Sequence, residues 1–232
     1  LYNDAPITTN CKSENKVGKS ETIQNYSSLE PRASLNVLLG NTSSLKASYN
    51  RMTQYIHLLS NTAASSSLDV WTPSTNNIEP EIADAYVIGY FKNFKNNTYE
   101  ASLELYYKDL QNQIDYIDGA DLLINKYIEG DLLTGIGRAY GLEFLFKKNR
   151  GRYNGWFSYT LGRSELKIDG INQYQWYPTR YDQTHNIKIT STYKINDRVQ
   201  VSGNFVYLTG TPVTFPSSKF VIQGFAIPHN AS

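Results

Sequence analysis

Apolar and polar side chains alternate along most of this chain with a period of two. From Tyr99 to Tyr107, one set of alternate residues is aromatic or aliphatic, and the residues between them include Glu100 and Glu104. This alternation is typical of β-strands whose two faces meet different surroundings. It predicts eight strands, near residues 29–39, 44–55, 83–94, 98–117, 136–148, 152–165, 184–195 and 198–208.

The segments between the predicted strands alternate between short turns and long polar stretches. The short turns are rich in Gly, Asn and Asp and predict β-hairpins at residues 40–43, 95–97, 149–151 and 196–197. The long stretches cover residues 56–82, 118–137, 166–183 and 209 onward, and only residues 122–133 suit a short helix. We therefore expect an all-β, antiparallel chain with tight turns at one end and long loops at the other.

Alternation alone leaves open which face of the strands is buried. A soluble sandwich packs its apolar faces together, whereas a membrane barrel turns them toward lipid. Predicted strands of about 11 to 20 residues exceed the usual 5 to 6 residues and suit tilted transmembrane strands. Short turns opposite long loops also favour the barrel. Aromatic residues near strand ends predict an interfacial girdle of Tyr49, Tyr55, Tyr86, Tyr90, Phe94, Tyr99, Tyr153, Trp156, Tyr193 and Tyr207.

Composition narrows the classes of partner and of chemistry. With 22 Lys and Arg against 21 Asp and Glu, the chain is nearly neutral, which argues against a nucleic-acid partner. The longest apolar run, residues 85–91, is too short for a membrane-spanning helix. A single cysteine, Cys11, excludes an internal disulfide and a zinc site built of several thiolates. We interpret it as an incidental thiol.

Several runs of the chain resemble the barrel of TonB-dependent outer-membrane receptors of the Bacteroidetes type. The resemblance extends from about residue 28 to 216, in the family's order. It implies part of a transmembrane β-barrel of about 22 strands, with periplasmic turns and extracellular loops. It rests on LEPRASLN (29–36), KASYNRMTQYIHLLSNT (46–62), GYFKNF (89–94), NQIDYIDGADL (112–122), GRAYGLEF (137–144), GWFSYTLGRSE (155–165) and YPTRYDQTHNIKI (177–189).

The resemblance also implies function, location and partners. Receptors of this family sit in the bacterial outer membrane and import scarce ligands with energy that TonB delivers. Eight strands are an incomplete barrel, so we expect an interior segment in the C-terminal half, with residues 1–27 and 217–232 as extracellular loop. The expected partners are outer-membrane lipid, the remaining strands, a plug domain and the TonB complex, the last two reached through polypeptide outside this chain. A surface lipoprotein is left open as a further partner.

No motif of an enzyme, a cofactor site or a metal site occurs in the sequence. His57, His185 and His229 lie far apart and lack metal-ligand spacing, so we expect His185 to have a structural hydrogen-bonding role. Acidic residues at positions 109, 115, 118 and 121 lack the glycine and the final glutamate of a calcium loop. The sequence therefore predicts a protein that is not an enzyme and needs no cofactor or metal.

Two groups of residues are candidates for function. Aromatic and charged residues in the long loops suit recognition of an organic ligand, or else they anchor the loops. The charged residues on the polar side of the strands are expected to face the lumen or the plug. The loop candidates are Trp71, Asp118, Trp176, Tyr177 and Arg180, and the lumen candidates are Glu100, Glu104, Lys108, Glu143 and Lys188.

The sequence leaves the ligand and two other classes of protein open. A siderophore, a metal complex, a glycan and a peptide all remain as ligands, because loops within one barrel family accept very different cargo. A secreted β-sandwich that binds carbohydrate is one alternative, and it predicts that the apolar strand faces bury one another. A passive or structural outer-membrane barrel is the other.

Overall fold

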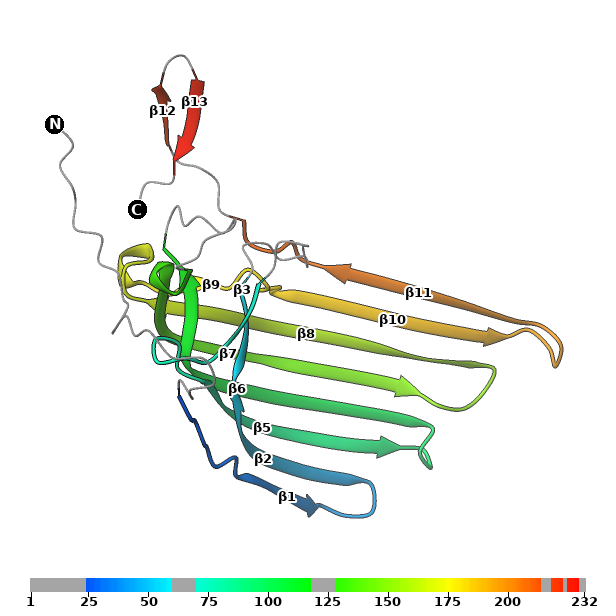
Figure 1. Ribbon diagram of the computed structural model, residues 1–232. Coiled ribbons are helices and arrows are strands. Elements are labelled where there is room, and N and C mark those ends of the chain that lie inside the picture. The colour runs from blue at the N-terminus through cyan, green and yellow to red at the C-terminus, as the bar shows by residue number, and fades with distance from the viewer. Residues whose placement is uncertain (1–23, 60–69, 118–127, 214–217, 223–224, 230–232) are drawn as a thin grey trace.

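A computed structural model describes residues 24–59, 70–117, 128–213, 218–222 and 225–229. One antiparallel sheet of nine strands dominates it, with the order β1-β2-β5-β6-β7-β8-β10-β11 and with β9 paired to β8 (Figure 1). Two hairpins, β3–β4 and β12–β13, are separate from it. The sheet confirms the predicted all-β fold. Its strands are β1 (Arg32–Leu38), β2 (Ser43–Gln54), β5 (Glu81–Phe94), β6 (Tyr99–Tyr116), β7 (Leu132–Lys148), β8 (Tyr153–Ile168), β9 (Tyr177–Pro178), β10 (His185–Lys194) and β11 (Gln200–Leu208).

The eight predicted strands correspond to the eight strands along the main path, but two predicted loops are too long. Strand β7 begins at Leu132 rather than at 136, and β8 continues to Ile168 rather than ending at 165. Burial explains both extensions, because Leu133, Leu166 and Ile168 pack into one hydrophobic cluster. Pairing and packing with distant segments thus extend the strands beyond what local periodicity indicates.

Short elements inside the predicted loops were also missed. Residues 56–82 contain the hairpin of β3 (Ile56–Leu59) and β4 (Val70–Pro73), and residues 166–183 contain β9 and a 3₁₀ turn, η2 (Asn172–Tyr174). The C-terminal hairpin consists of β12 (Ser218–Ile222) and β13 (Phe225–His229). In the stretch 122–133, the only one that suited a short helix, the described part contains only the 3₁₀ turn η1 (Ile128–Asp131) before β7, and residues 122–127 lie outside it.

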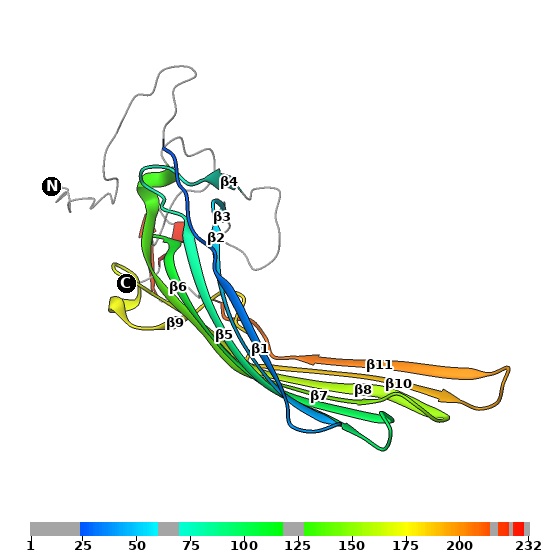
Figure 2. The ribbon, with the colours of Figure 1, turned by 90° about the horizontal axis from the view of Figure 1, so that it is seen from below.

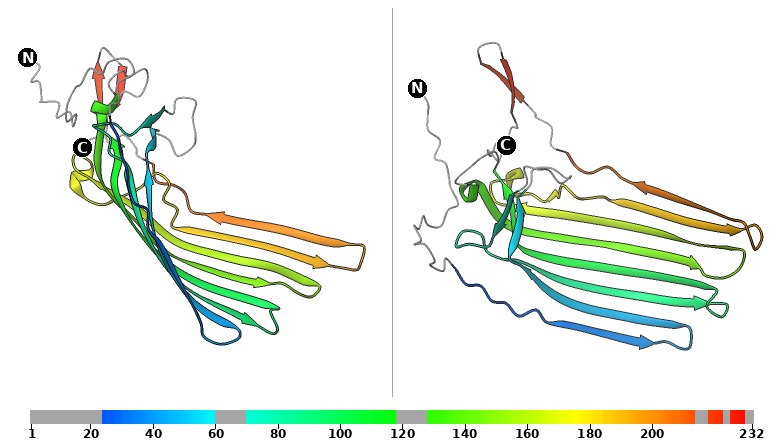
Figure 3. Two further views of the ribbon diagram at one scale, coloured as in Figure 1. Left: turned by 60° about the horizontal axis from the view of Figure 1, so that its bottom comes forward. Right: turned by 45° about the vertical axis from the view of Figure 1, so that its right-hand side comes forward.

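The long strands run side by side, with tight hairpin turns at one end and longer connections at the other. Figure 1 shows the tight turns of β1–β2, β5–β6, β7–β8 and β10–β11 together at the right-hand end. Figures 2 and 3 show that the sheet curves and that the hairpin β3–β4 stands at the opposite end, called the loop end below. Among the described residues no strand pairs with the free edges of β1 and β11, so the barrel is not closed within this chain.

The register gathers the alternating apolar residues of neighbouring strands on one side, called the apolar face. Leu103 of β6 lies opposite Tyr90 of β5 and Phe144 of β7, and it is 42% exposed. In the described part of the chain, no second sheet covers this face. The mutual burial that a sandwich requires is therefore not seen. One full row across the apolar face is Val37, Leu45, Tyr90, Leu103, Phe144, Tyr159, Ile187 and Tyr207.

The opposite side of the sheet, called the polar face, carries mainly small, hydroxyl and charged side chains, with fewer large apolar ones such as Phe91, Leu145 and Val206. Two small buried clusters lie at the loop end, one around Leu59, Ile78 and Leu132 and the other around Leu133 and Ile168. Leu132 and Leu133 are successive residues of β7, so the two clusters lie on opposite sides of that strand. None of the described helical segments has the length and apolar character required to cross a membrane. One row of the polar face is Asn36, Lys46, Gly89, Glu104, Glu143, Thr160 and Asn186.

Candidate functional site

A row of tyrosines ends the apolar part of the apolar face toward the loop end. Tyr49, Tyr86, Tyr107 and Tyr140 lie opposite one another on β2, β5, β6 and β7. We call them the tyrosine row, and the apolar face between this row and the tight turns is the apolar band. Phenol rings suit such a boundary, since each has an apolar body and a polar tip.

Two residues beyond the tyrosine row, the same face becomes charged. The cross-strand partners there form a second row, called the charged row, on five neighbouring strands. Because strand direction alternates, the charged residue follows the tyrosine in β2 and β6 but precedes it in β5 and β7. The members of the charged row are Arg51, Asp84, Asp109, Arg138 and Glu165.

The Arg51–Asp84 pair fixes one end of the charged row. The Arg51 guanidinium donates from Nε to Asp84 Oδ1 at 2.8 Å and from Nη2 to Oδ2 at 2.7 Å, while the Tyr49 hydroxyl donates to Oδ1 at 2.7 Å. These hydrogen bonds, first from Arg51 and then from Tyr49, hold the pKa of Asp84 below its ordinary value of 3.8. Asp84 lies on the loop side of Tyr86, outside the apolar band. The pair is therefore charged at neutral pH.

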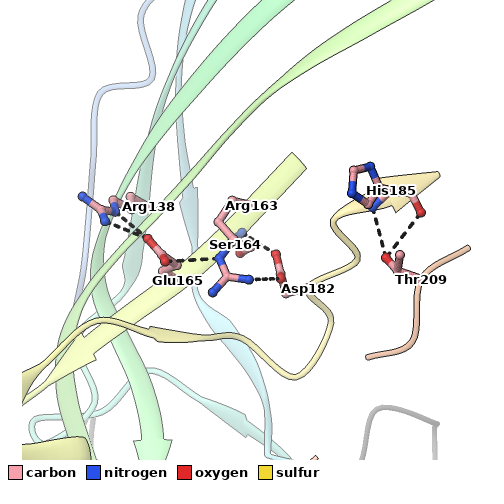
Figure 4. Close-up of polar contacts among 7 residues, drawn as sticks. All are labelled: Arg138, Arg163, Ser164, Glu165, Asp182, His185 and Thr209. Atoms are coloured by element: carbon pink, nitrogen blue, oxygen red, sulfur yellow. Dashed lines mark hydrogen bonds and ion pairs between the residues drawn. The ribbon is translucent and has the colours of Figure 1, made fainter. Parts of the chain in front are cut away.

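A second network, on β7 and β8, fixes the other end of the charged row (Figure 4). Arg138 Nε donates to Glu165 Oε2 at 2.9 Å, and Arg163 Nε donates to Glu165 Oε1 at 3.2 Å. Burial by itself raises the pKa of Glu165, but the hydrogen bonds from Arg138 and Arg163 outweigh it and leave the pKa below its ordinary value of 4.5. The carboxylate is thereby kept ionised between two cations.

Asp182 connects this network to the segment between β8 and β10. Its Oδ1 accepts from the Ser164 backbone N–H at 2.7 Å, and its Oδ2 accepts from Arg163 Nη1 at 3.0 Å. The side chain is buried, and both interactions are drawn in Figure 4. A buried carboxylate with such donors is satisfied, so Asp182 stabilises the segment that returns from η2 to β10.

Three of the predicted ligand-binding residues meet in that same segment. The ring of Trp176 lies 4.1 Å from the Arg138 guanidinium. Tyr177 donates from its hydroxyl to Asp115 Oδ2 at 2.9 Å, and Arg180 donates from Nη2 to Asp115 Oδ1 at 3.1 Å. The ring of Trp176 is thus engaged with β7, and the polar groups of Tyr177 and Arg180 are engaged with β6. This is the geometry of loop anchoring that the sequence left open for these residues.

The remaining two loop candidates are not part of this cluster. Trp71 lies on β4 opposite Leu58 of β3, and its side chain is 66% exposed. Asp118 lies outside the described residues. Trp71 is therefore the loop candidate whose ring is open to an incoming molecule.

The predicted lumen residues all lie on the polar face, where two carboxylates are direct neighbours. Glu104 of β6 lies opposite Glu143 of β7, and within the described residues neither forms an ion pair. Like charges directly opposite each other repel, so this pair favours a cationic or hydrogen-bonding partner. Glu100 accepts from Asn149 Nδ2 at 2.6 Å, and Lys108 lies 6.0 Å from the ring of Tyr106.

Two further predictions on this face have different outcomes. Lys188 lies opposite Ser158 and Val206, on the polar face as predicted. Trp156, predicted as part of the aromatic girdle, lies instead on the polar face opposite Lys147 and Thr190. The reason for the error is that a position near a strand end does not tell which face a side chain takes. Alternation along β8 does, and it places Trp156 on the face opposite to Phe157 and Tyr159.

The described histidines are held by hydrogen bonds. His185 Nδ1 lies 2.9 Å from the Tyr159 hydroxyl, and the His185 backbone N–H donates to Thr209 Oγ1 at 3.0 Å (Figure 4). The buried His57 places Nε2 2.9 Å from Ser74 Oγ. Across the described ranges, no three His, Cys, Asp or Glu residues gather as a metal site. Cys11 and the side chain of His229 lie outside the described part.

The charged row and Asp182 were missed at the level of sequence, although the sequence carries a signal for the row. A charged residue and a tyrosine are separated by one residue in YNR (49–51), DAY (84–86), YKD (107–109) and RAY (138–140). The order inverts between successive strands, as it must if each pair marks the same level of an antiparallel sheet. No comparable local signal marks Asp182.

Comparisons with known proteins support one family. A family model described as TonB dependent receptor-like, beta-barrel, matches residues 7–227, and this is a family of receptors rather than of enzymes. A search of curated proteins gives no match.

Three solved structures resemble the fold and are longer than this chain. The FpvA–pyoverdine complex of P. aeruginosa has a TM-score of 0.55 at 15% identity and covers 77% of this chain. The alcaligin outer-membrane receptor FauA of Bordetella pertussis has a TM-score of 0.52 at 18% identity and covers 78%. The FpvAI–pyocin S2 complex has a TM-score of 0.53 at 16% identity and covers 75%. The aligned part spans only 22%, 29% and 22% of those chains, respectively.

Proposed function

Because the chain belongs to the family of TonB-dependent receptor β-barrels, we propose that it forms part of the wall and outer loops of an importer in the bacterial outer membrane. In this proposal the loops capture a scarce ligand, a plug domain closes the lumen, and the TonB complex supplies the energy for uptake. The remaining strands and the plug belong to polypeptide beyond this segment, and a surface lipoprotein is a further candidate partner.

The apolar band is the observation that carries the proposal. On β6 it runs from Tyr99 to Tyr107, which is ~27 Å at about 3.4 Å per residue. Strands of an outer-membrane barrel tilt by about 35 to 45°, so this length corresponds to ~21 Å along the membrane normal, close to the apolar belt of about 25 Å between two aromatic girdles. Exposed Leu103 and Leu105 in the middle of the band favour lipid as the medium that covers it. Outer-membrane lipid is accordingly the first partner of this face.

The charges of the polar face support the proposal that this face lines the barrel lumen and contacts a plug domain or water there. Glu104 and Glu143 repel each other unless water, a cation or a donor group from a partner satisfies them. In this proposal Glu100, Glu104, Lys108, Glu143 and Lys188 contact the plug or the water of the lumen. The register supports it by placing all five on the face opposite the apolar band.

Ligand capture is assigned to the loop end, with different roles for the aromatic residues there. Trp71 offers an exposed ring on the β3–β4 hairpin. Trp176, Tyr177 and Arg180 instead fix the segment between β8 and β10, so that its exposed rings, Tyr174 and Tyr181, are available to a ligand. The ligand classes that suit such rings are a siderophore, a metal complex, a glycan or a peptide. No catalytic group is required for this role.

Membrane fractionation and uptake test the proposal. The complete receptor that contains this chain should fractionate with the outer membrane and should migrate differently on a gel when folded and when boiled. Ligand accumulation should be lost when TonB is deleted. A receptor that is soluble without detergent would refute the barrel, and accumulation that persists without TonB would favour a passive barrel instead.

A further inference from the structure

We infer that the tight-turn end of the barrel wall binds anionic phospholipids of the periplasmic leaflet through a rim of lysine and arginine side chains. The inference rests on the proposed function, because it requires that the apolar band faces lipid and that the tight turns face the periplasm. It adds a lipid-binding surface of defined charge at the border of the band opposite to the loop end.

Positive charge is concentrated at this end of the sheet. The hairpin ends at residues 92–100, 147–153 and 194–200 carry eight cations and two carboxylates, although the whole chain has a net charge of only +1. Their tight turns lie together at one end of the sheet (Figure 1). The rest of the chain is therefore negative overall, and such a local excess of cations attracts anionic partners. The eight cations, called the basic rim, are Lys92, Lys95, Lys147, Lys148, Arg150, Arg152, Lys194 and Arg198.

The register turns part of the basic rim toward lipid. Lys148 of β7 lies opposite Tyr99 of β6, which in turn lies opposite Phe94 of β5, so the three residues form one row on the apolar face. Lys92 of β5 lies on the same face, opposite Ala101, and its Nζ is 5.9 Å from the centre of the Phe94 ring. A lysine stem lies along apolar surface while its ammonium group reaches the headgroup layer. Both lysines are therefore positioned for lipid and not for the lumen.

The ammonium groups lie beside aromatic rings that border the apolar band. Lys95 Nζ is 5.8 Å from the centre of the Tyr99 ring. Lys148 Nζ is close to two rings, 5.7 Å from the centre of Tyr99 and 5.5 Å from that of Tyr153. Aromatic rings near the ends of barrel strands mark the membrane–water interface, where the phosphates of a lipid lie. These lysines are thus held at the depth of the headgroups.

The cations of the basic rim are not neutralised by carboxylates. Within the described part of the chain, no member of the rim forms an ion pair, whereas Arg51 and Arg138 of the charged row are each paired with a carboxylate. Glu100 accepts a hydrogen bond from Asn149 and lies on the polar face, and Asp197 lies in the β10–β11 turn. The lysines on the apolar face therefore keep their full charge for a phosphate.

A phospholipid with a net negative headgroup matches both parts of this surface. Its acyl chains cover the apolar band, and its phosphate meets the basic rim where the band ends. A zwitterionic headgroup carries its own cation, which offsets the attraction to the rim. A soluble acidic partner would meet the turn residues Arg150 and Arg198, but it would not account for Lys92 and Lys148 on the lipid-facing side.

Native mass spectrometry of the complete receptor in detergent tests the inference. The probes are phosphatidylglycerol and phosphatidylcholine with the same acyl chains, and the wild type should bind phosphatidylglycerol more tightly. Lys148→Gln should lower the affinity for phosphatidylglycerol by roughly fivefold, with little change for phosphatidylcholine. Lys92→Gln/Lys95→Gln/Lys148→Gln should lower it further, by a similar factor for each additional lysine.

Lys147→Gln is the matched control for Lys148→Gln. It makes the same chemical change at the preceding residue of β7, which lies on the polar face opposite Glu100. It should bind phosphatidylglycerol as the wild type does. Equal losses in Lys147→Gln and Lys148→Gln would overturn the inference, since they would show a response to net charge alone, as for a soluble acidic partner.

Wild-type affinity for phosphatidylglycerol in the triple-lysine variant would also overturn the inference. Because these lysines form no ion pair with a described residue, their replacement leaves no described carboxylate unpaired, and the variant should keep the folded, heat-modifiable band. That outcome leaves membrane insertion and TonB-dependent uptake intact, so it is distinct from a failure of the proposed function.

Discussion

Leu103→Arg tests whether the apolar band faces lipid. Leu103 is midway between Tyr99 and Tyr107 on β6, which is ~14 Å along the strand from each aromatic border at about 3.4 Å per residue. An arginine on the lipid face of a barrel costs about 2 to 4 kcal/mol at the bilayer midplane and about 0 to 1 kcal/mol near the interface. Leu103→Arg should therefore lower the free energy of unfolding by about 2 to 4 kcal/mol.

Equilibrium unfolding of the complete receptor in lipid vesicles measures this cost. Tyr107→Arg, at the border of the band, is the depth control and should cost ~1 kcal/mol for the charge in addition to the loss of the ring. Glu104→Arg places the same side chain on the polar face and should not show the midplane cost. Equal costs for Leu103→Arg and Glu104→Arg would refute the assignment of the two faces.

Three further changes test the loop end and the packing of the sheet. The pKa of Asp84 lies below its ordinary value of 3.8, so the Arg51–Asp84 ion pair should stabilise the fold above pH 3.8 and lose that contribution as the pH falls further. The melting temperature measured against pH should therefore depend less on acid in Asp84→Asn than in the wild type. Asp182→Ala removes the acceptor of the Arg163 side chain and the Ser164 backbone N–H, and it should lower the free energy of unfolding by about 1 to 3 kcal/mol. It should also expose residues 169–184 to protease, and unchanged proteolysis would contradict the anchoring role of Asp182. Gly141→Ala places a methyl group against the Leu161 backbone oxygen and should cost about 1 to 3 kcal/mol in denaturant unfolding, whereas Gly203→Ala enters open space and should be mild; equal effects would count against the close strand contact.

Local pattern determined the strands of this protein and the two faces of each strand. Alternation from Tyr99 to Tyr107 fixes which side chains share a side, because successive residues of a strand point in opposite directions. Turn residues at 40–43, 95–97, 149–151 and 196–197 fixed the hairpins, and these place neighbouring strands antiparallel. The positions of Glu104 and Glu143 on the polar face followed from the same periodicity.

Tertiary structure decided what the periodicity does not contain, which is the register between strands and the contacts of the loops. Register places Arg51 against Asp84, since it depends on hydrogen bonds between segments and not on local sequence. Asp115 accepts hydrogen bonds from Tyr177 and Arg180, which follow it by 62 and 65 residues. Contacts between residues so far apart in the sequence form only after the pairing of β6, β7 and β8 has brought the loop segments together. Local sequence therefore contains no signal for them.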